Sequence, residues 1–232
     1  MSVRLGMFKL VKVMVVSVTL TMGWVNGSVA ASFDCNKAST ETEVAICSDP
    51  ELSKFDETLA AEYQRVDPSS EFSNYIRTDH FKWLKAERDA SIYNLQAQFY
   101  KLKYLNSFEN CSFSKQLPLD NCIRILDEQM STCMEKNNWT NWEMNLCGFS
   151  LARSYRVIVK FMTDKKVEAL ASDHETIDLL KSSQKLWLDF IDVECQRQWS
   201  EYREGTMRGQ IQSGCLLYHY EQRIKVIARE IE

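Results

Sequence analysis

Apolar side chains recur along most of the chain with the three- and four-residue spacing of an amphipathic helix. In residues 184–195, Trp187 and Ile191 fall on one face of a helix that we expect to end near Cys195. A second apolar stripe follows Cys215 at spacings of four, three and four residues. Its members are Leu216, Tyr220, Arg223 and Ile227. Glycines lie between the two stripes, where the chain must turn back. The pattern therefore predicts a helical hairpin fastened by a Cys195–Cys215 disulfide.

Two helix starts are marked by capping residues in the first quarter of the chain. Thr40 and Glu43 have the spacing of a capping box, in which a hydroxyl and a carboxylate each satisfy a free backbone amide. Asp49 and Pro50 supply the N-cap and the first position of the next helix. We expect the first of these helices to be short and to end near Cys47.

Longer helical patterns fill the rest of the chain. We expect one helix from Glu71 to about Leu105 and a loop from Asn106 to Pro118. Three further helices are expected at about residues 119–134, at 142–170 and from Ser172 onward. Only seven glycines and three prolines interrupt 232 residues, and no alternating β-branched run appears after the first thirty residues. The predicted fold class is all-α, a disulfide-stapled helical bundle.

One order of elements occurs twice: two cysteines, a helix with a Trp-Leu pair, then a helix that carries a cysteine. The two copies cover residues 32–130 and 131–232 and predict two related helical-hairpin modules, with Trp83 and Trp187 in their structural cores. The repeat is not strict, because the first copy has Ser91 where the second has Cys195. Chance recurrence of similar helices is the alternative.

Residues 1–31 have the features of a signal peptide. Three basic residues precede a short apolar run, and small residues at 28–31 provide a cleavage site. The apolar run is too short to cross a bilayer about 30 Å thick as a helix that rises about 1.5 Å per residue. We therefore expect a cleaved signal, no membrane anchor after cleavage, and a periplasmic or secreted protein.

All eight cysteines follow this segment, and an even number in an exported chain indicates disulfides. They are Cys35, Cys47, Cys111, Cys122, Cys133, Cys147, Cys195 and Cys215. Pairing neighbours would join 35–47, 111–122, 133–147 and 195–215, although eight cysteines allow 105 connectivities. A metal site is the rival interpretation, but no pair has C-x-x-C spacing and the histidines lie far from any such pair. We expect no metal and no cofactor.

The charge balance changes when the signal peptide is removed. Of 28 basic residues 25 remain, against 32 acidic ones, so the net charge moves from −4 to −7. An acidic protein is a poor partner for nucleic acid, which requires a basic stripe. Long-range attraction instead favours a cationic partner, and salt weakens that attraction.

Residues 32–52, SFDCNKASTETEVAICSDPEL, resemble the opening of the LprI-type lysozyme inhibitor family. Residues 180–195, with their Gln-x-x-Trp-Leu motif, and residues 214–224, with a late Glu-Gln-Arg, are similar to its later part. The resemblance implies an exported helical domain that inhibits lysozyme, with c-type lysozyme or another basic cell-wall hydrolase as partner. It supplies no inhibitory residue, and Ile191 stands where family members usually have arginine.

Three functions follow from these observations. The first is binding and blocking of a basic muramidase, with residues 106–118 and 196–214 as loops that disulfides hold in shape. The second is an envelope interaction or scaffold module without lysozyme inhibition. The third is a peptidoglycan-acting enzyme, but carboxylate pairs such as Glu87/Asp89 and Glu201/Glu204 have the spacing of solvated helix charges. We expect no enzyme, no catalytic residue, and a packed rather than a catalytic His219.

Overall fold

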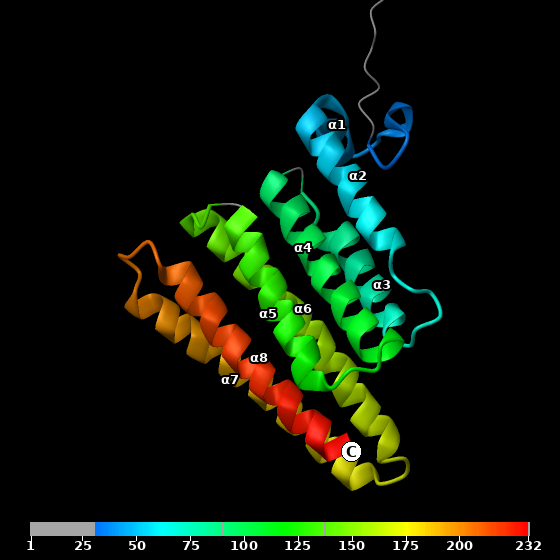
Figure 1. The fold of residues 1–232 in the computed structure, drawn as a ribbon, viewed down its shortest axis with the longest axis vertical. Helices are drawn as coiled ribbons and strands as arrows, with labels where there is room; N and C mark the ends of the chain where they lie inside the picture. The colour runs from blue at the N-terminus through cyan, green and yellow to red at the C-terminus, as the bar shows by residue number, and fades with distance from the viewer. Residues whose placement is uncertain (1–30, 90, 137, 232) are drawn as a thin grey trace, which may run out of the picture.

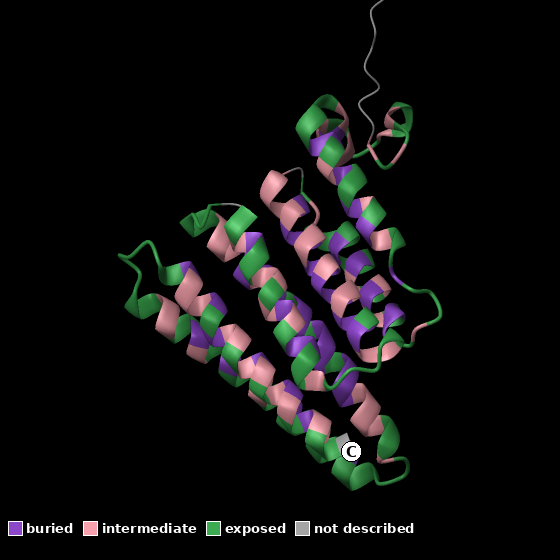
Figure 2. Ribbon diagram, in the orientation of Figure 1, coloured by how far each residue is buried: buried purple, intermediate pink, exposed green. Residues whose placement is uncertain are grey.

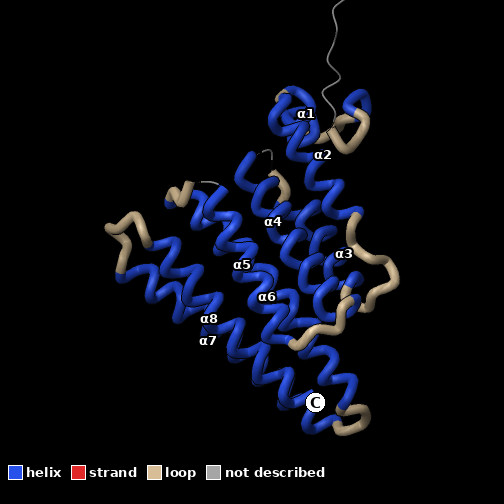
Figure 3. The backbone as a smooth tube through the Cα atoms, in the orientation of Figure 1, coloured by secondary structure: helices blue, strands red, loops and turns tan. Residues whose placement is uncertain are grey.

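The computed structural model describes residues 31–89, 91–136 and 138–231, and this part of the chain contains helices and no strands (Figures 1 and 3). The all-α prediction is confirmed. The signal-peptide prediction falls on residues outside this part, apart from Ala31. The helices are η1 (Cys35–Lys37), α1 (Glu41–Ser48), α2 (Pro50–Gln64), α3 (Ser73–Lys82), α4 (Ile92–Glu109), α5 (Leu119–Lys136), α6 (Asn141–Ala169), α7 (His174–Glu201) and α8 (Arg208–Ile231). Two π-helical turns, η2 (Trp83–Glu87) and η3 (Asn110–Ser114), extend α3 and α4.

Both helix starts that the capping residues predicted are confirmed. The Thr40 hydroxyl accepts a hydrogen bond from the Glu43 amide at 3.1 Å, and the Glu43 carboxylate accepts one from the Thr40 amide at 3.1 Å. The Asp49 carboxylate accepts from the Glu51 amide at 2.8 Å at the start of α2. These side chains satisfy amides that a helix start leaves without a partner.

The single helix expected from Glu71 to Leu105 is wrong, because the chain turns between α3 and α4. Arg88 is extended, and the Ser91 hydroxyl caps α4 by accepting from the Asn94 amide at 3.1 Å. Asp89 in turn accepts from the Ser91 hydroxyl at 2.6 Å. Short polar side chains such as these bond to nearby backbone and compete with a continuous helix.

The two loops expected at residues 106–118 and 196–214 are also mostly wrong. Helix α4 and η3 continue to Ser114, and α7 ends at Glu201 rather than near Cys195. Several of their polar residues lie on solvent-facing helix surfaces, although Glu109 and Ser213 are buried. Arg197, for example, pairs with Glu194 at 2.6 Å and with Glu201, at helical spacings of three and four residues.

Helix α6 is the central element, since it packs against α4 on one side and α8 on the other. Its Leu151, Tyr155 and Ile158 are buried, and buried residues concentrate between the helices (Figure 2). Phe161 of α6 meets the ring of Phe72 edge-on, with ring centroids 5.1 Å apart. One hydrophobic core therefore draws on helices from both halves of the chain.

The predicted division at residues 130 and 131 falls inside α5, which continues to Lys136. The Cys133–Cys147 disulfide then joins α5 to α6. Two related modules remain a prediction, but they share one core and are not separated by a linker at that point.

Candidate functional site

Helices α7 and α8 form the predicted hairpin, and the Cys195–Cys215 disulfide joins them with Cα atoms 5.6 Å apart. The other six cysteines also pair with their neighbours in sequence. These pairs are Cys35–Cys47, Cys111–Cys122 and Cys133–Cys147. Each closes a loop, which in the chain-entropy model stabilises the fold by about 3 kcal/mol.

The motifs of the hairpin form one side-chain cluster between α7 and α8. The Arg223 guanidinium donates to the Gln184 side-chain oxygen at 2.8 Å and lies 5.5 Å from the centre of the Trp187 ring. Tyr220 meets Trp187 edge-on at 5.7 Å, and burial raises the pKa of Tyr220 to about 12. Cation–π and aromatic contacts of this kind each contribute about 1 kcal/mol. The cluster fastens the hairpin.

Trp83 lies in a different environment, in spite of the similar motif. It is 3% exposed, its ring stacks on His80 at 5.5 Å, and His80 stacks on Tyr63 at 4.4 Å. Gln98 of α4 contacts the His80 Nδ1 at 3.0 Å, and burial lowers the pKa of His80 to about 4. The apolar pattern did not indicate a role for His80. Its spacing could have done so, because His80 lies three residues before Trp83, just as Gln184 lies three residues before Trp187.

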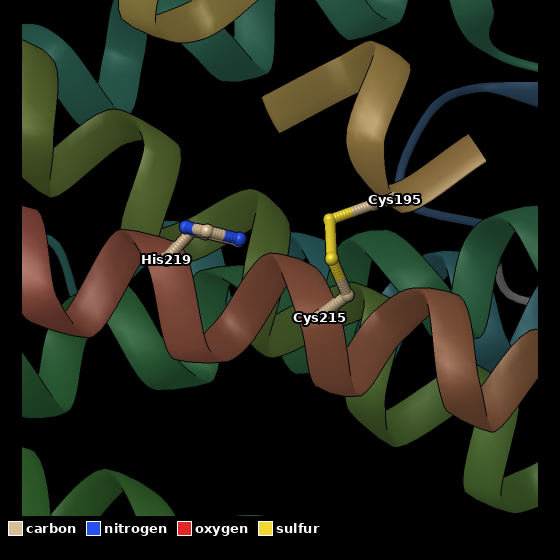
Figure 4. Close-up of side chains that lie close together, drawn as sticks. All are labelled: Cys195, Cys215 and His219. Atoms are coloured by element: carbon tan, nitrogen blue, oxygen red, sulfur yellow. A yellow bond between two sulfur atoms is a disulfide. The ribbon is translucent and has the colours of Figure 1, made fainter. Parts of the chain in front are cut away.

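His219 lies beside the Cys195–Cys215 disulfide, with the ligand atoms of all three residues within 4.8 Å of one another (Figure 4). The i, i+4 spacing from Cys215 on α8 could have indicated this proximity. While the disulfide is intact, neither sulfur is available as the thiolate that binds metals in proteins. His219 contacts Phe190 of α7 edge-on at 5.9 Å. We therefore assign it to the packing of the hairpin.

The carboxylate pairs considered for catalysis include members with structural partners. Asp89 binds the amide and the hydroxyl of Ser91, and Glu201 pairs with Arg197. Such partners hold these carboxylates in place and give them a structural role.

Helices η1 and α1 and the first half of α2 form what we call the acidic end, and they project beyond the other helices (Figure 1). Residues 31–57, which make up this end, contain seven carboxylates and two basic side chains. The carboxylates that are exposed or partly exposed on the acidic end are Asp34, Glu41, Glu43, Asp49, Glu51 and Glu57. Buried Asp56 instead pairs with Arg88 at 3.0 Å and accepts from the Ser32 amide at 2.9 Å. This pair attaches the acidic end to the turn before α4.

The site thus belongs to a disulfide-fastened helical module whose hairpin is held by a Gln–Trp–Arg cluster. Residues 127–226 match the family described as "Lysozyme inhibitor LprI". The matched region runs from the middle of α5 into α8 and contains the Trp187 cluster and two disulfides. The family resemblance is confirmed there. The match does not extend to residues 32–126, where the related first copy remains a prediction.

One curated protein with a similar sequence is "Uncharacterized protein R02472" of Rhizobium meliloti (strain 1021). The two are 26% identical over 104 residues, which is 44% of this chain and 71% of that protein. No solved structure matches the chain.

Among the described helices, none combines the length and the apolar character that crossing a bilayer requires. The four disulfides and the family match indicate an extracellular or periplasmic protein.

Proposed function

We propose that the protein binds and inhibits a basic lysozyme-type muramidase. The observation that carries the proposal is the match of residues 127–226 to the lysozyme inhibitor family. The matched segment contains the hairpin that a disulfide and the Trp187 cluster hold rigid. A surface held in shape before binding loses little conformational entropy on association, which favours tight inhibition.

The acidic end supports the proposal through its charge. Residues 31–57 have a net charge of −5 by count, within a net charge of −7 for the chain after residue 31. A cationic enzyme that approaches the protein is therefore attracted mainly to this end. Opposite charges on two surfaces accelerate encounter more than they increase final affinity, and salt weakens the effect.

Turbidity of a peptidoglycan suspension measures the proposed activity. The oxidised protein should slow clearing by a c-type lysozyme, and the effect should weaken as salt rises. Protein with reduced and alkylated cysteines serves as the control and should inhibit less. Full lysozyme activity in excess oxidised protein would refute the proposal. Release of sugar by the protein alone would instead indicate an enzyme.

A second candidate function is an envelope interaction module, and one observation favours it. The outer face of α7 exposes large apolar side chains, including Leu186, which is 69% exposed, and Val193, which is 71% exposed. Leu179 and Phe190 continue the same ridge at helical spacing. Apolar ridges of this kind mark protein contacts. Lack of lysozyme inhibition together with loss of a partner in an L186D/V193D variant would favour this function.

A further inference from the structure

A groove lies between α3 and α7, and α6 forms its floor. Its volume is about 1360 Å³, above the roughly 300–1,000 Å³ of ordinary small-molecule sites. The lining of the floor runs from Arg153 to Glu168, a distance of about 22 Å at 1.5 Å per residue. The groove therefore suits an extended chain of several units better than one small metabolite.

The groove carries positive charge on an acidic protein. Eight basic and five acidic side chains line it. Three of the lysines are neutralised: Lys101 by Asp79 at 2.5 Å, Lys160 by Asp164 at 2.6 Å, and Lys165 by Glu71 at 2.5 Å. Within the described residues, five cations of the lining form no ion pair. These are Lys82, Arg153, Arg156, Lys181 and Lys185.

These unpaired cations come from all three sides of the groove. Arg153 and Arg156 are exposed on α6 at a spacing of three residues, so they lie on one face of the floor. Lys181 and Lys185 are exposed on α7 one helical turn apart and form the opposite wall from Lys82. An anionic ligand in the groove meets guanidinium and ammonium donors on both walls and on the floor.

We propose that the groove binds an acidic polysaccharide, a chain in which carboxylate-bearing sugars alternate with neutral ones. The unpaired arginines and lysines bind the carboxylates. Asn74 and Thr78 supply hydrogen-bond donors and acceptors for the sugar hydroxyls. The same hydroxyls donate to carboxylates of the lining such as Glu168. Tyr75 is half-buried, its hydroxyl donates to Asp164 at 2.8 Å and the Lys160 ammonium lies 5.4 Å from its ring centre, so the part of the ring that stays exposed provides an apolar surface for a sugar.

The lining disfavours a nucleic acid as the ligand. Single strands bind where several aromatic rings stack on successive bases, and Tyr75 is the aromatic residue in this lining. The carboxylates of the lining, Glu87 among them, interrupt the run of unpaired cations, so a chain with one phosphate on every unit would place some phosphates beside carboxylates. A polysaccharide with widely spaced charges places neutral, hydroxyl-bearing sugars beside those carboxylates.

Fluorescence anisotropy of a labelled hyaluronan hexasaccharide, titrated with the oxidised protein at low salt, tests the proposal. Hyaluronan alternates a carboxylate sugar with a neutral one. We expect saturable binding that weakens as salt rises, and no binding of a neutral chitin hexasaccharide. R153E/R156E should weaken binding at least about tenfold, because it removes two cations that donate charge-assisted hydrogen bonds to the ligand carboxylates.

R203E/R229E is the matched control, because it makes the same charge change at exposed arginines outside the groove. It should leave binding within about twofold. Circular dichroism verifies that both variants fold. The proposal is overturned if hyaluronan does not bind, if both variants lose affinity equally, or if a single-stranded DNA of equal charge binds more tightly at the same arginines. It does not depend on lysozyme inhibition, which the turbidity assay measures separately.

Discussion

The acidic end and the basic groove are two surfaces of opposite charge on one chain. Residues 31–57 contain seven acidic and two basic side chains, whereas the groove lining contains five acidic and eight basic ones. A net charge of −7 for the chain after residue 31 conceals this difference. Net charge indicates which partners the whole molecule attracts from a distance. The side chains that line each surface decide what each one binds.

The two surfaces are also held in different ways. Helix α1 packs against α2 and η1, the Cys35–Cys47 disulfide joins it to η1, and the Asp56–Arg88 pair attaches α2 to the turn before α4. The groove floor is α6, which is central to the core. The acidic end should therefore open locally, whereas the groove should open only with the fold as a whole.

Removal of single disulfides should give the largest difference between the two regions. C195A/C215A should lower the global free energy of unfolding by about 3 kcal/mol, because the hairpin belongs to the core. C35A/C47A removes a bond of similar strength, but its effect should be confined to α1 and η1. Thermal unfolding and amide hydrogen exchange measure the global and local effects. Equal losses of melting temperature would contradict a locally fastened acidic end.

Loss of the link between the acidic end and the rest of the molecule should have a slightly smaller effect. R88A leaves the buried Asp56 carboxylate without its cation and should cost somewhat less than the roughly 3 kcal/mol of a broken buried pair, because the amide and hydroxyl of Ser32 still donate to that carboxylate. R124A, which breaks an exposed pair with Glu128, should cost under about 1 kcal/mol. Chemical denaturation compares the two. Similar costs would show that the Asp56–Arg88 pair does not hold the acidic end.

Acid should weaken the groove wall before the acidic end. The pKa of His80 is lowered to about 4, mainly by burial, which outweighs the opposing effect of Asp79 and is assisted by nearby Lys101 and Arg88. The folded protein thus keeps His80 neutral. The contribution of neutral His80 to the free energy of unfolding is complete above the unfolded pKa near 6.5. It is lost as pH falls toward 4, and the loss is about 2 kcal/mol at pH 5.

The pKa of Glu43 in the acidic end is lowered by hydrogen bonds from the amides of Ser39 and Thr40. The contribution of the ionised Glu43 carboxylate to stability is present above the unfolded pKa of 4.5 and is lost only as pH falls below that value. As pH falls from about 6.5 to 4.5, the protection of backbone amides against hydrogen exchange should therefore decrease in α3 but not in α1. H80Q should flatten the dependence of melting temperature on pH in this range. An unchanged dependence would exclude His80 as its source.

Charge reversal on the acidic end should have the smallest effect on stability. E51K/E57K should change the free energy of unfolding by under about 1 kcal/mol, yet slow association with a c-type lysozyme severalfold at low salt. D189K/E204K makes the same charge change on exposed residues elsewhere and should slow association less. Stopped-flow fluorescence compares the rates. Equal rates for the two variants would show that net charge alone controls encounter.

Local chemistry explains what the sequence could predict. The four disulfides join neighbouring cysteines, and the Thr40 and Asp49 caps depend on residues within one turn. The break at Arg88–Ser91 was missed because the apolar spacing continues across it, while a side-chain cap decides the backbone there.

The groove was beyond prediction for a different reason. Lys82, Arg153 and Lys181 are far apart in sequence, and only the packing of three helices brings them to one surface. The helix faces that carry them are visible in the sequence as polar positions. Their relative placement depends on how α3 and α7 pack around α6 and the helices beside it.

Helix α6 gives the groove an additional property. The same 29-residue rod that carries Arg153 and Arg156 to the surface also buries Tyr155 and Ile158 on its other side. A polysaccharide bound in the groove therefore contacts α6, the helix against which elements of both halves of the chain pack. Binding of the ligand to the folded state should raise the melting temperature of the entire protein by mass action. The helices that line the groove should show no separate unfolding transition.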